Sequence, residues 1–183
     1  MFNGKRKSGK DFLTDWLCNK FNETDKKTSV IIRLSGPLKK CYADNHGLDY
    51  SRLLDASDYK EKYRKDMISW SEKIRNEDPS YFCLKAIEMY RGEDFPIWII
   101  SDCRRKSDFQ FFDNTYTDKC KKVRVHASDE VRISRGFVFQ QGVDDAESEC
   151  GLDNEKCDFC IENNGNKVPA ELLQGILKVV ETI

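Results

Sequence analysis

The sequence has no apolar run that approaches the roughly 20 consecutive residues needed for a membrane-spanning helix. It has no signal-peptide core at its start and no peroxisomal tripeptide at its end, so we expect a cytoplasmic protein with no membrane partner. It also has almost no net charge, since 31 basic residues against 32 acidic ones leave a formal charge of −1. This balance argues against a general nucleic-acid-binding protein, and we expect no nucleic-acid partner.

Histidine is scarce, and His46 and His126 lie too far apart in sequence to suggest a shared site, so we assign them no role. The eight cysteines, in a chain expected inside the cell, indicate reduced thiols rather than disulfides. Cys157 and Cys160 have a metal-like spacing with Cys150 nearby, but no second pair stands at a spacing that would complete a zinc site. We therefore do not expect a metal at the cysteines.

Internal repeats and low-complexity segments are absent too, and 183 residues with 39% hydrophobic content suffice for one compact domain. Strand-like apolar runs alternate with helical patterns, and these runs cover residues 30–34, 97–100, 123–126 and 159–161. Such alternation predicts an α/β fold with a parallel sheet.

The helical patterns include residues 58–76, a helix that begins with Asp78 as N-cap and Pro79 as its first residue, and the closing segment 170–183. The patterns within residues 35–94 therefore predict a mainly helical insertion between the strands expected at 30–34 and 97–100.

Gly4, Gly9 and Lys10 have the Gly-x-x-x-x-Gly-Lys spacing of a phosphate-binding loop. In such a loop the glycines adopt backbone angles closed to other residues, so that consecutive N–H groups point at phosphate oxygens while the lysine holds the outer phosphates. The usual Ser or Thr after the lysine is replaced by Asp11. The loop also contains three cations, namely Lys5, Arg6 and Lys7. On spacing alone, a basic surface turn explains the segment equally well.

The pattern behind the loop favours phosphate binding. Apolar residues that follow Asp11 fall on one face at helical spacing, and they are Phe12, Leu13, Trp16, Leu17 and Phe21. The loop is therefore expected to open an amphipathic helix, as phosphate-binding loops do.

Ligands of parallel sheets bind at the carboxyl ends of the strands. Asp102, Arg104 and Arg105 follow the run 97–100, where a carboxylate usually holds Mg²⁺ or its waters and arginines can fork onto phosphate oxygens. Lys39 follows the run 30–34, after a Gly-Pro turn that can present it to an anion. Each charge alone is more often a solvated loop residue, but convergence at one edge favours a site.

Two further cationic groups lie outside the sheet. The first occupies the long inserted helix or its end, and its members are Lys60, Arg64, Lys65 and Arg75. The second is Arg132 with Arg135, which share a face of a helix and can close as a lid with Gly136 as hinge. The acidic run 142–151 that follows either pairs with lid arginines or loop cations, or is an ordinary solvated segment.

These segments resemble the animal-type phosphomevalonate kinases, which are similar in fold to nucleoside monophosphate kinases. The resemblance runs over nearly the whole chain and is carried by residues 4–11, 34–39, 59–67, 101–105 and 142–153. Its distinctive motifs are the Asp after the loop lysine and the run Val-Asp-Asp-Ala-Glu-Ser-Glu-Cys-Gly-Leu-Asp.

The resemblance implies a P-loop three-layer α/β sandwich formed by a single kinase domain over residues 1–183. Its parts would be the phosphate loop at 4–11, an acceptor-binding insertion at about 35–95 and a small lid at about 129–142. It implies transfer of the γ-phosphoryl group of Mg·ATP to 5-phosphomevalonate, which yields 5-diphosphomevalonate and ADP on the route to isoprenoids and sterols, cholesterol included. We expect a monomer.

The resemblance also implies roles for individual residues. The expected ATP-binding set is Gly4, Lys5, Arg6, Lys7, Ser8, Gly9, Lys10, Asp11, Arg132, Arg135 and Asn163, the last near the adenine. The expected acceptor-binding set is Lys39, Lys60, Arg64, Arg75, Arg104 and Arg105. Lys10 would act in catalysis with Arg6, Lys7 and Arg104, and Asp11 and Asp102 would hold Mg²⁺.

Two departures from the family pattern stand out. Leu84 occupies a place where an arginine is expected, so one acceptor contact is lost or moved to Lys85. Only Met1, Phe2 and Asn3 precede the loop, where relatives carry a longer apolar strand, so we expect a truncated or compromised copy. A nucleoside monophosphate kinase and a non-catalytic anion-binding protein therefore stay open as alternatives.

Overall fold

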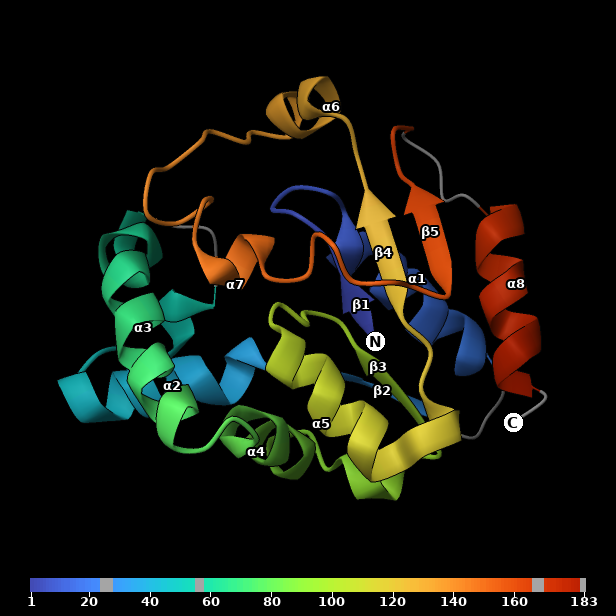
Figure 1. Cartoon of the computed structure of the whole chain (residues 1–183), viewed down its shortest axis with the longest axis horizontal. Helices are drawn as coiled ribbons and strands as arrows, with labels where there is room; N and C mark the ends of the chain where they lie inside the picture. The colour runs from blue at the N-terminus through green and yellow to red at the C-terminus, as the bar shows by residue number, and fades with distance from the viewer. Residues whose placement is uncertain (24–27, 55–57, 166–169, 182–183) are drawn as a thin grey trace.

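The strands form two parallel sheets in the computed structural model, which describes residues 1–23, 28–54, 58–165 and 170–181 (Figure 1). One sheet has the order β1-β4-β5, and these strands are Phe2–Asn3, Val123–His126 and Phe159–Glu162. The other pairs β2 (Ser29–Ile32) with β3 (Ile97–Ile100). A hydrogen bond of 3.0 Å from Cys103 N–H to the Phe2 carbonyl joins the segment after β3 to β1. The predicted parallel α/β fold is confirmed, although its one expected sheet is divided at this point.

Helices cover both faces of the strands and make a three-layer arrangement. On one face α1 (Lys10–Phe21) and α8 (Ala170–Glu181) enclose a core of Phe2, Leu13, Leu17, Ile99, Val123, Val125, Ile161, Leu173 and Ile176. On the other face α4 (Tyr81–Met89) and α5 (Lys106–Tyr116) enclose Ile32, Leu34, Cys83, Ala86, Ile87, Ile100, Cys103, Phe109, Phe112 and Leu152. Ile99 and Ile100 fall in different cores because neighbouring strand residues point to opposite faces.

The segment between β2 and β3 is mainly helical. It contains α2 (Ser35–His46), the 3-10 helix η1 (Ser51–Leu53), α3 (Asp58–Glu77), α4 and the 3-10 helix η2 (Gly92–Asp94). Tyr42, Ala43, Leu53 and Met67 form a separate core between α2 and α3, with Trp70 packed against it. Figure 1 shows this pair of helices at one side of the sheets. The apolar stripe of α3 is therefore buried against α2 rather than against a strand.

The segment after α5 carries three short helices. They are η3 (Thr117–Lys119) before β4, and α6 (Asp129–Ser134) and α7 (Glu147–Cys150) after it. Figure 1 shows α7 between the phosphate loop and α3, and α6 above the carboxyl end of β4. None of the helices in the described ranges has the length and apolar character needed to cross a membrane.

Three local predictions are wrong in detail. The strand expected at residues 30–34 is β2, which ends at Ile32, and Leu34 is the buried N-cap residue of α2, so Gly36 and Pro37 lie in the first turn of this helix and not in a turn before it. Helix α4 begins at Tyr81 because Asp78 accepts hydrogen bonds from the Ser80 N–H (2.9 Å) and hydroxyl (2.5 Å) and forms a turn ahead of the helix. Phe12 is 52% exposed, so it lies outside the apolar face that Leu13 and Leu17 occupy.

Candidate active site

The phosphate loop has the backbone geometry that its glycines predict. Gly4 has φ 147° and Gly9 has φ 89°, which are conformations that other residues rarely adopt. A β-carbon at Gly4 would stand 2.2 Å from the Val125 carbonyl oxygen, and one at Gly9 would stand 2.2 Å from Asn163 Nδ2. Lys7, with φ 62°, takes the left-handed conformation without being glycine. The loop is therefore pressed against β4 and the end of β5, and larger residues at either glycine would displace it.

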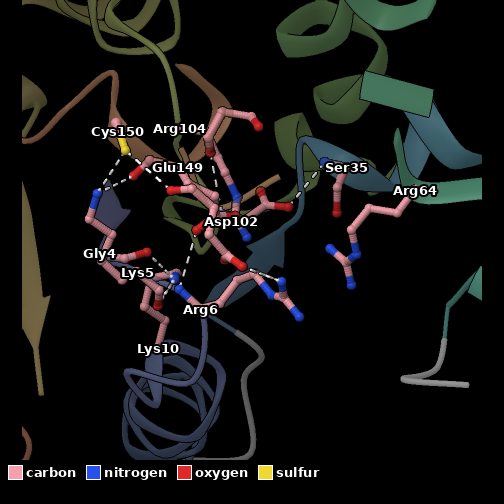
Figure 2. Close-up of polar contacts among 12 residues, drawn as sticks. Gly4, Lys5, Arg6, Lys10, Ser35, Arg64, Asp102, Arg104, Glu149 and Cys150 are labelled. Atoms are coloured by element: carbon pink, nitrogen blue, oxygen red, sulfur yellow. Dashed lines mark hydrogen bonds and ion pairs between the residues drawn. The ribbon is translucent and has the colours of Figure 1, made fainter. Parts of the chain in front are cut away.

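Lys10 begins α1 with its side chain folded into the loop. It is 8% exposed, and Nζ donates to the Gly4 carbonyl and, at 3.2 Å, to the Lys5 carbonyl (Figure 2). Burial, and secondarily the nearby Arg104 guanidinium, lowers the pKa of Lys10 to about 8. A buried ammonium with this tendency to lose its proton has a strong electrostatic reason to bind an anion.

The loop cations pair with one acidic segment, residues 144–153, which contains α7. Arg6 NH1 lies 3.0 Å from Asp144 Oδ2, and Lys5 Nζ lies 2.6 Å from Asp153 Oδ2. Lys5 Nζ also donates to Cys150 Sγ at 3.2 Å. For the run 142–151, the predicted pairing with the loop cations is thus confirmed at Asp144, whereas the lid arginines take other partners. Asp153 lies two residues beyond that run.

Glu149 bridges the loop and the end of β3. One carboxylate oxygen accepts the backbone N–H of Arg6 at 3.2 Å, and the other forms an ion pair with Arg104 (Figure 2). The Glu149 side chain is only 5% exposed, and its charge also raises the pKa of Lys10 against the dominant effect of burial. The Glu149 carboxylate therefore lies near three groups that carry positive charge or partial positive charge, namely the Arg6 N–H, the Arg104 guanidinium and the Lys10 ammonium.

Arg132 of α6 and Arg135, the residue that directly follows this helix, reach the loop from the side opposite α7. Arg132 Nε donates to the Arg6 carbonyl at 2.9 Å, and its guanidinium stacks 3.9 Å from the Phe137 ring centroid. Arg135 NH1 donates to the Ser8 carbonyl at 3.2 Å, and its NH2 donates to the Asn163 carbonyl at 2.9 Å. The shared face predicted for this arginine pair therefore meets the phosphate loop, with Gly136 at φ 80° directly after it.

Asn163, at the end of β5, is 3% exposed and donates from Nδ2 to the Ser8 carbonyl at 2.8 Å. It holds the loop backbone in place. Ser8 is equally buried, and its hydroxyl oxygen has no hydrogen-bond partner among the described residues.

A pocket of about 150 Å³ lies beside the loop, between α2, α3 and the end of β3. All six residues predicted to bind the acceptor line it, namely Lys39, Lys60, Arg64, Arg75, Arg104 and Arg105. Its apolar wall consists of Leu34, Leu38, Met67, Ile68 and Val143. No aromatic ring stands among the described residues that line this pocket. The pocket thus suits a small, flexible anion better than a flat base.

Two of these arginines also connect α3 with the start of α5. Arg75 NH1 lies 2.9 Å from Asp108 Oδ1, with side chains 6% and 1% exposed, and Arg105 forms an ion pair with Glu72. The second oxygen of Asp108 accepts the backbone N–H groups of Arg104 (2.8 Å) and Arg105 (3.0 Å) and thereby caps α5. Arg75 Nε, however, is buried without a hydrogen-bond partner among the described residues. Arg75 therefore combines a structural ion pair with a buried donor that has no partner among the described residues.

Arg64 and Lys39 supply the charge at the α3 and α2 sides. Arg64 forms its ion pair with Glu61 on the same helix, and the pKa of Glu61 is lowered by Arg64 and, less strongly, by Arg6. In Figure 2 the Arg6 and Arg64 side chains extend toward each other from the loop and from α3. Burial lowers the pKa of Lys39, while Asp102 opposes that shift. The pocket is therefore strongly cationic where α3 faces the phosphate loop.

Asp102, which its position after β3 predicts to hold Mg²⁺, hydrogen-bonds to the start of α2 in the structure. Its two oxygens accept the backbone N–H groups of Leu34 (2.6 Å) and Ser35 (3.1 Å), so the carboxylate caps α2 and joins the ends of β2 and β3. Each oxygen keeps further acceptor capacity, and Asp102 lines the pocket. Asp11 lies exposed in the first turn of α1. These are hard oxygen donors of the kind that suits Mg²⁺, either directly or through water.

Lys85 does not take the place of the expected arginine. It pairs with Glu88 at 2.9 Å on the exposed face of α4, while Leu84 is 53% exposed on the same helix. Neither residue is among those that line the pocket.

Sequence reasoning missed Asp108, Glu72 and the specific role of Glu149. The spacing of Arg105 and Asp108 was an available signal for Asp108. Arg105 is the N-cap residue of α5, and an acidic residue three positions after an N-cap commonly completes a capping box. No local pattern pointed to Glu72, because its partner lies 33 residues away.

The chain is similar to known proteins along most of its length. A family model described as phosphomevalonate kinase matches residues 2–118. A curated relative from Drosophila melanogaster, named phosphomevalonate kinase, is 39% identical over 156 residues, which are 84% of this chain and 80% of the relative. Among solved structures, the crystal structure of TT1252 from Thermus thermophilus matches with a TM-score of 0.49 and 16% identity, over 99% of this chain and 94% of that one.

Proposed function

The chain belongs to the phosphomevalonate kinase family, and on that premise we propose how its residues share the phosphoryl transfer. The protein is a phosphotransferase that phosphorylates phosphomevalonate in the mevalonate pathway of isoprenoid biosynthesis. We propose ATP as the donor, with 5-diphosphomevalonate and ADP as products. We further propose that it serves sterol synthesis, cholesterol included, and acts in the cytoplasm as a monomeric single domain with no nucleic-acid or membrane partner.

ATP binds at the loop in this proposal. The N–H groups of the Gly4–Asp11 backbone surround the phosphates, with Lys10 at the outer ones. Lys5, Arg6 and Lys7 add positive charge around them, and Arg132 and Arg135 close from α6. These two arginines already contact the loop carbonyls, which supports their assignment to the nucleotide side. Asn163, which holds the same loop segment, lies on the adenine side.

The acceptor binds in the pocket, and the convergence of the six cations there carries the proposal. Phosphomevalonate has a phosphate at one end and a carboxylate at the other, so it needs two separated cationic anchors. Arg104, whose charge acts on Lys10, holds the phosphate together with Arg105 near the ATP. Lys39, Lys60, Arg64 and Arg75 surround the rest of the chain and its carboxylate.

The chemistry needs charge compensation more than a base. An oxygen of the acceptor phosphate bonds to the γ-phosphorus of ATP, and the bond from that phosphorus to the β–γ bridging oxygen breaks. Since the acceptor oxygen is already anionic, the main barrier is bringing two polyanions together and stabilising the charge as it moves. We assign that stabilisation to Lys10 and Arg104, with Arg6 and Lys7.

Mg²⁺ fits the oxygen donors of the site. Asp11 and Asp102 would hold it, Asp102 with the acceptor capacity left after capping α2. When bound, the ion neutralises charge on the β- and γ-phosphates.

Arg64→Met tests the acceptor assignment, because the ion pair of Arg64 lies within α3 and its loss breaks no hydrogen bond or ion pair between the described elements. We expect the KM for phosphomevalonate to rise at least about tenfold, since a charge-assisted contact contributes roughly 1.5–3 kcal/mol, while the KM for ATP changes less than about twofold. Lys73→Met, at an exposed position of α3, is the matched control. A rise in the ATP constant alone would place Arg64 on the nucleotide side.

A further inference from the structure

Glu149 is an anion in a site that binds anions, and its surroundings explain why it is there. Its carboxylate is almost fully buried, and it lines the acceptor pocket. Its two oxygens are divided between the phosphate loop, through the Arg6 N–H, and the acceptor side, through Arg104. No other carboxylate in the described ranges accepts hydrogen bonds from both of these parts.

Two effects of opposite sign follow from this position. The negative charge repels an incoming phosphate, so it weakens acceptor binding. The same carboxylate fixes the direction of the Arg104 side chain, whose other hydrogen bond among the described residues, to the Ser148 carbonyl, is 3.4 Å long. Orientation of a charged group at the reacting atoms is worth more in the transition state than in the ground state.

We propose that Glu149 is a positioning residue that fixes Arg104 and the Arg6 amide across the junction of the two substrate sites, at the expense of acceptor affinity. This inference rests on the proposed function of the pocket. It differs from the roles of Asp144 and Asp153, which pair with loop cations but do not reach Arg104.

Glu149→Gln and Glu149→Asp separate charge from position. Glutamine keeps the size and removes the charge, so we expect phosphomevalonate to bind about threefold to tenfold more tightly by titration calorimetry, while kcat falls about tenfold to 100-fold. Aspartate keeps the charge but shortens the reach, so we expect a similar loss of kcat with unchanged acceptor affinity. Glu147→Gln, which removes a charge from an exposed position of the same helix, is the control and leaves both constants within about twofold.

A purely structural role for Glu149 predicts parallel losses of affinity and kcat together with a lower Tm, in both variants. That result, or unchanged kcat in either variant, would overturn the proposal. If Glu149→Gln does not fold, the aspartate variant still decides, because unchanged kcat or weakened acceptor binding in it contradicts the positioning role. If the unaltered protein itself fails to turn over phosphomevalonate, the proposed function fails instead, which is a distinct outcome.

Discussion

At the scale of single residues, the site holds the buried ammonium of Lys10 near both a cation and an anion. Lys10 lies inside the loop and donates to two loop carbonyls, while Arg104 repels it and Glu149 attracts it. Because burial is the largest influence on its pKa, Lys10 holds its proton weakly in the free protein. A nearby phosphate would stabilise the charged form. The same balance makes Lys10 sensitive to pH.

The pKa of about 8 predicts an alkaline limb in the reaction with ATP. As pH rises through this value, the free protein loses the Lys10 charge, so kcat/KM for ATP should fall about tenfold per pH unit above about pH 8. At saturating ATP the triphosphate favours the ammonium, so the limb in kcat should move to higher pH. Lys10→Arg, which stays charged, should lack the limb. A constant wild-type kcat/KM between about pH 7 and 9.5 would contradict the assignment of Lys10 to the phosphates.

At the scale of elements, two short helices after β4 place side chains against the phosphate loop that the strands do not provide. Helix α6 brings Arg132 and Arg135 to one side of the loop, and α7 brings Glu149 to the other. The start of α5 is fixed by Asp108, which in turn holds Arg75 of α3. The acceptor pocket therefore depends on helix ends and on contacts between elements distant in sequence.

The lid assignment predicts a selective loss on the nucleotide side. Arg132→Ala and Arg135→Ala should each raise the KM for ATP at least about tenfold, because each removes charged donors next to the phosphates, with the KM for phosphomevalonate within about twofold. Ser134→Ala, on the same helix, is the control, since its hydroxyl donates to the Val131 carbonyl of that helix and to no other group among the described residues. Unchanged ATP kinetics in both arginine variants would exclude α6 from the nucleotide site.

The connection between α3 and α5 predicts a large stability effect. Asp108→Ala leaves Arg75 buried without its carboxylate and uncaps α5, so the free energy of unfolding in urea should fall by about 3–5 kcal/mol. Asp113→Ala, on the same helix, removes a more exposed pair with Lys122 and should cost less than about 1 kcal/mol. Equal losses in the two variants would show that the buried pair does not fix the insertion.

At the scale of the whole molecule, periodicity and loop spacing were enough to predict the α/β fold, and the six acceptor cations do meet in one pocket. Three kinds of detail were not predictable from local patterns. The start of α4 depends on the Asp78 turn, the exposure of Phe12 depends on packing, and the Glu72–Arg105 pair depends on the position of α3 relative to the start of α5. Asp102 shows the limit most clearly, since its place after β3 was foreseen but its bonds to the start of α2 were not.

The most direct test of the account is acceptor choice by the unaltered protein. In an assay that couples ADP release to a spectroscopic signal, we expect kcat/KM for phosphomevalonate to exceed that for AMP, CMP and UMP by at least about 10³, because the pocket offers separated cations and no ring for a base among its described lining residues. ATP consumption without acceptor provides the baseline. A nucleoside monophosphate that is phosphorylated as fast as phosphomevalonate, or no turnover with any acceptor, would contradict the account.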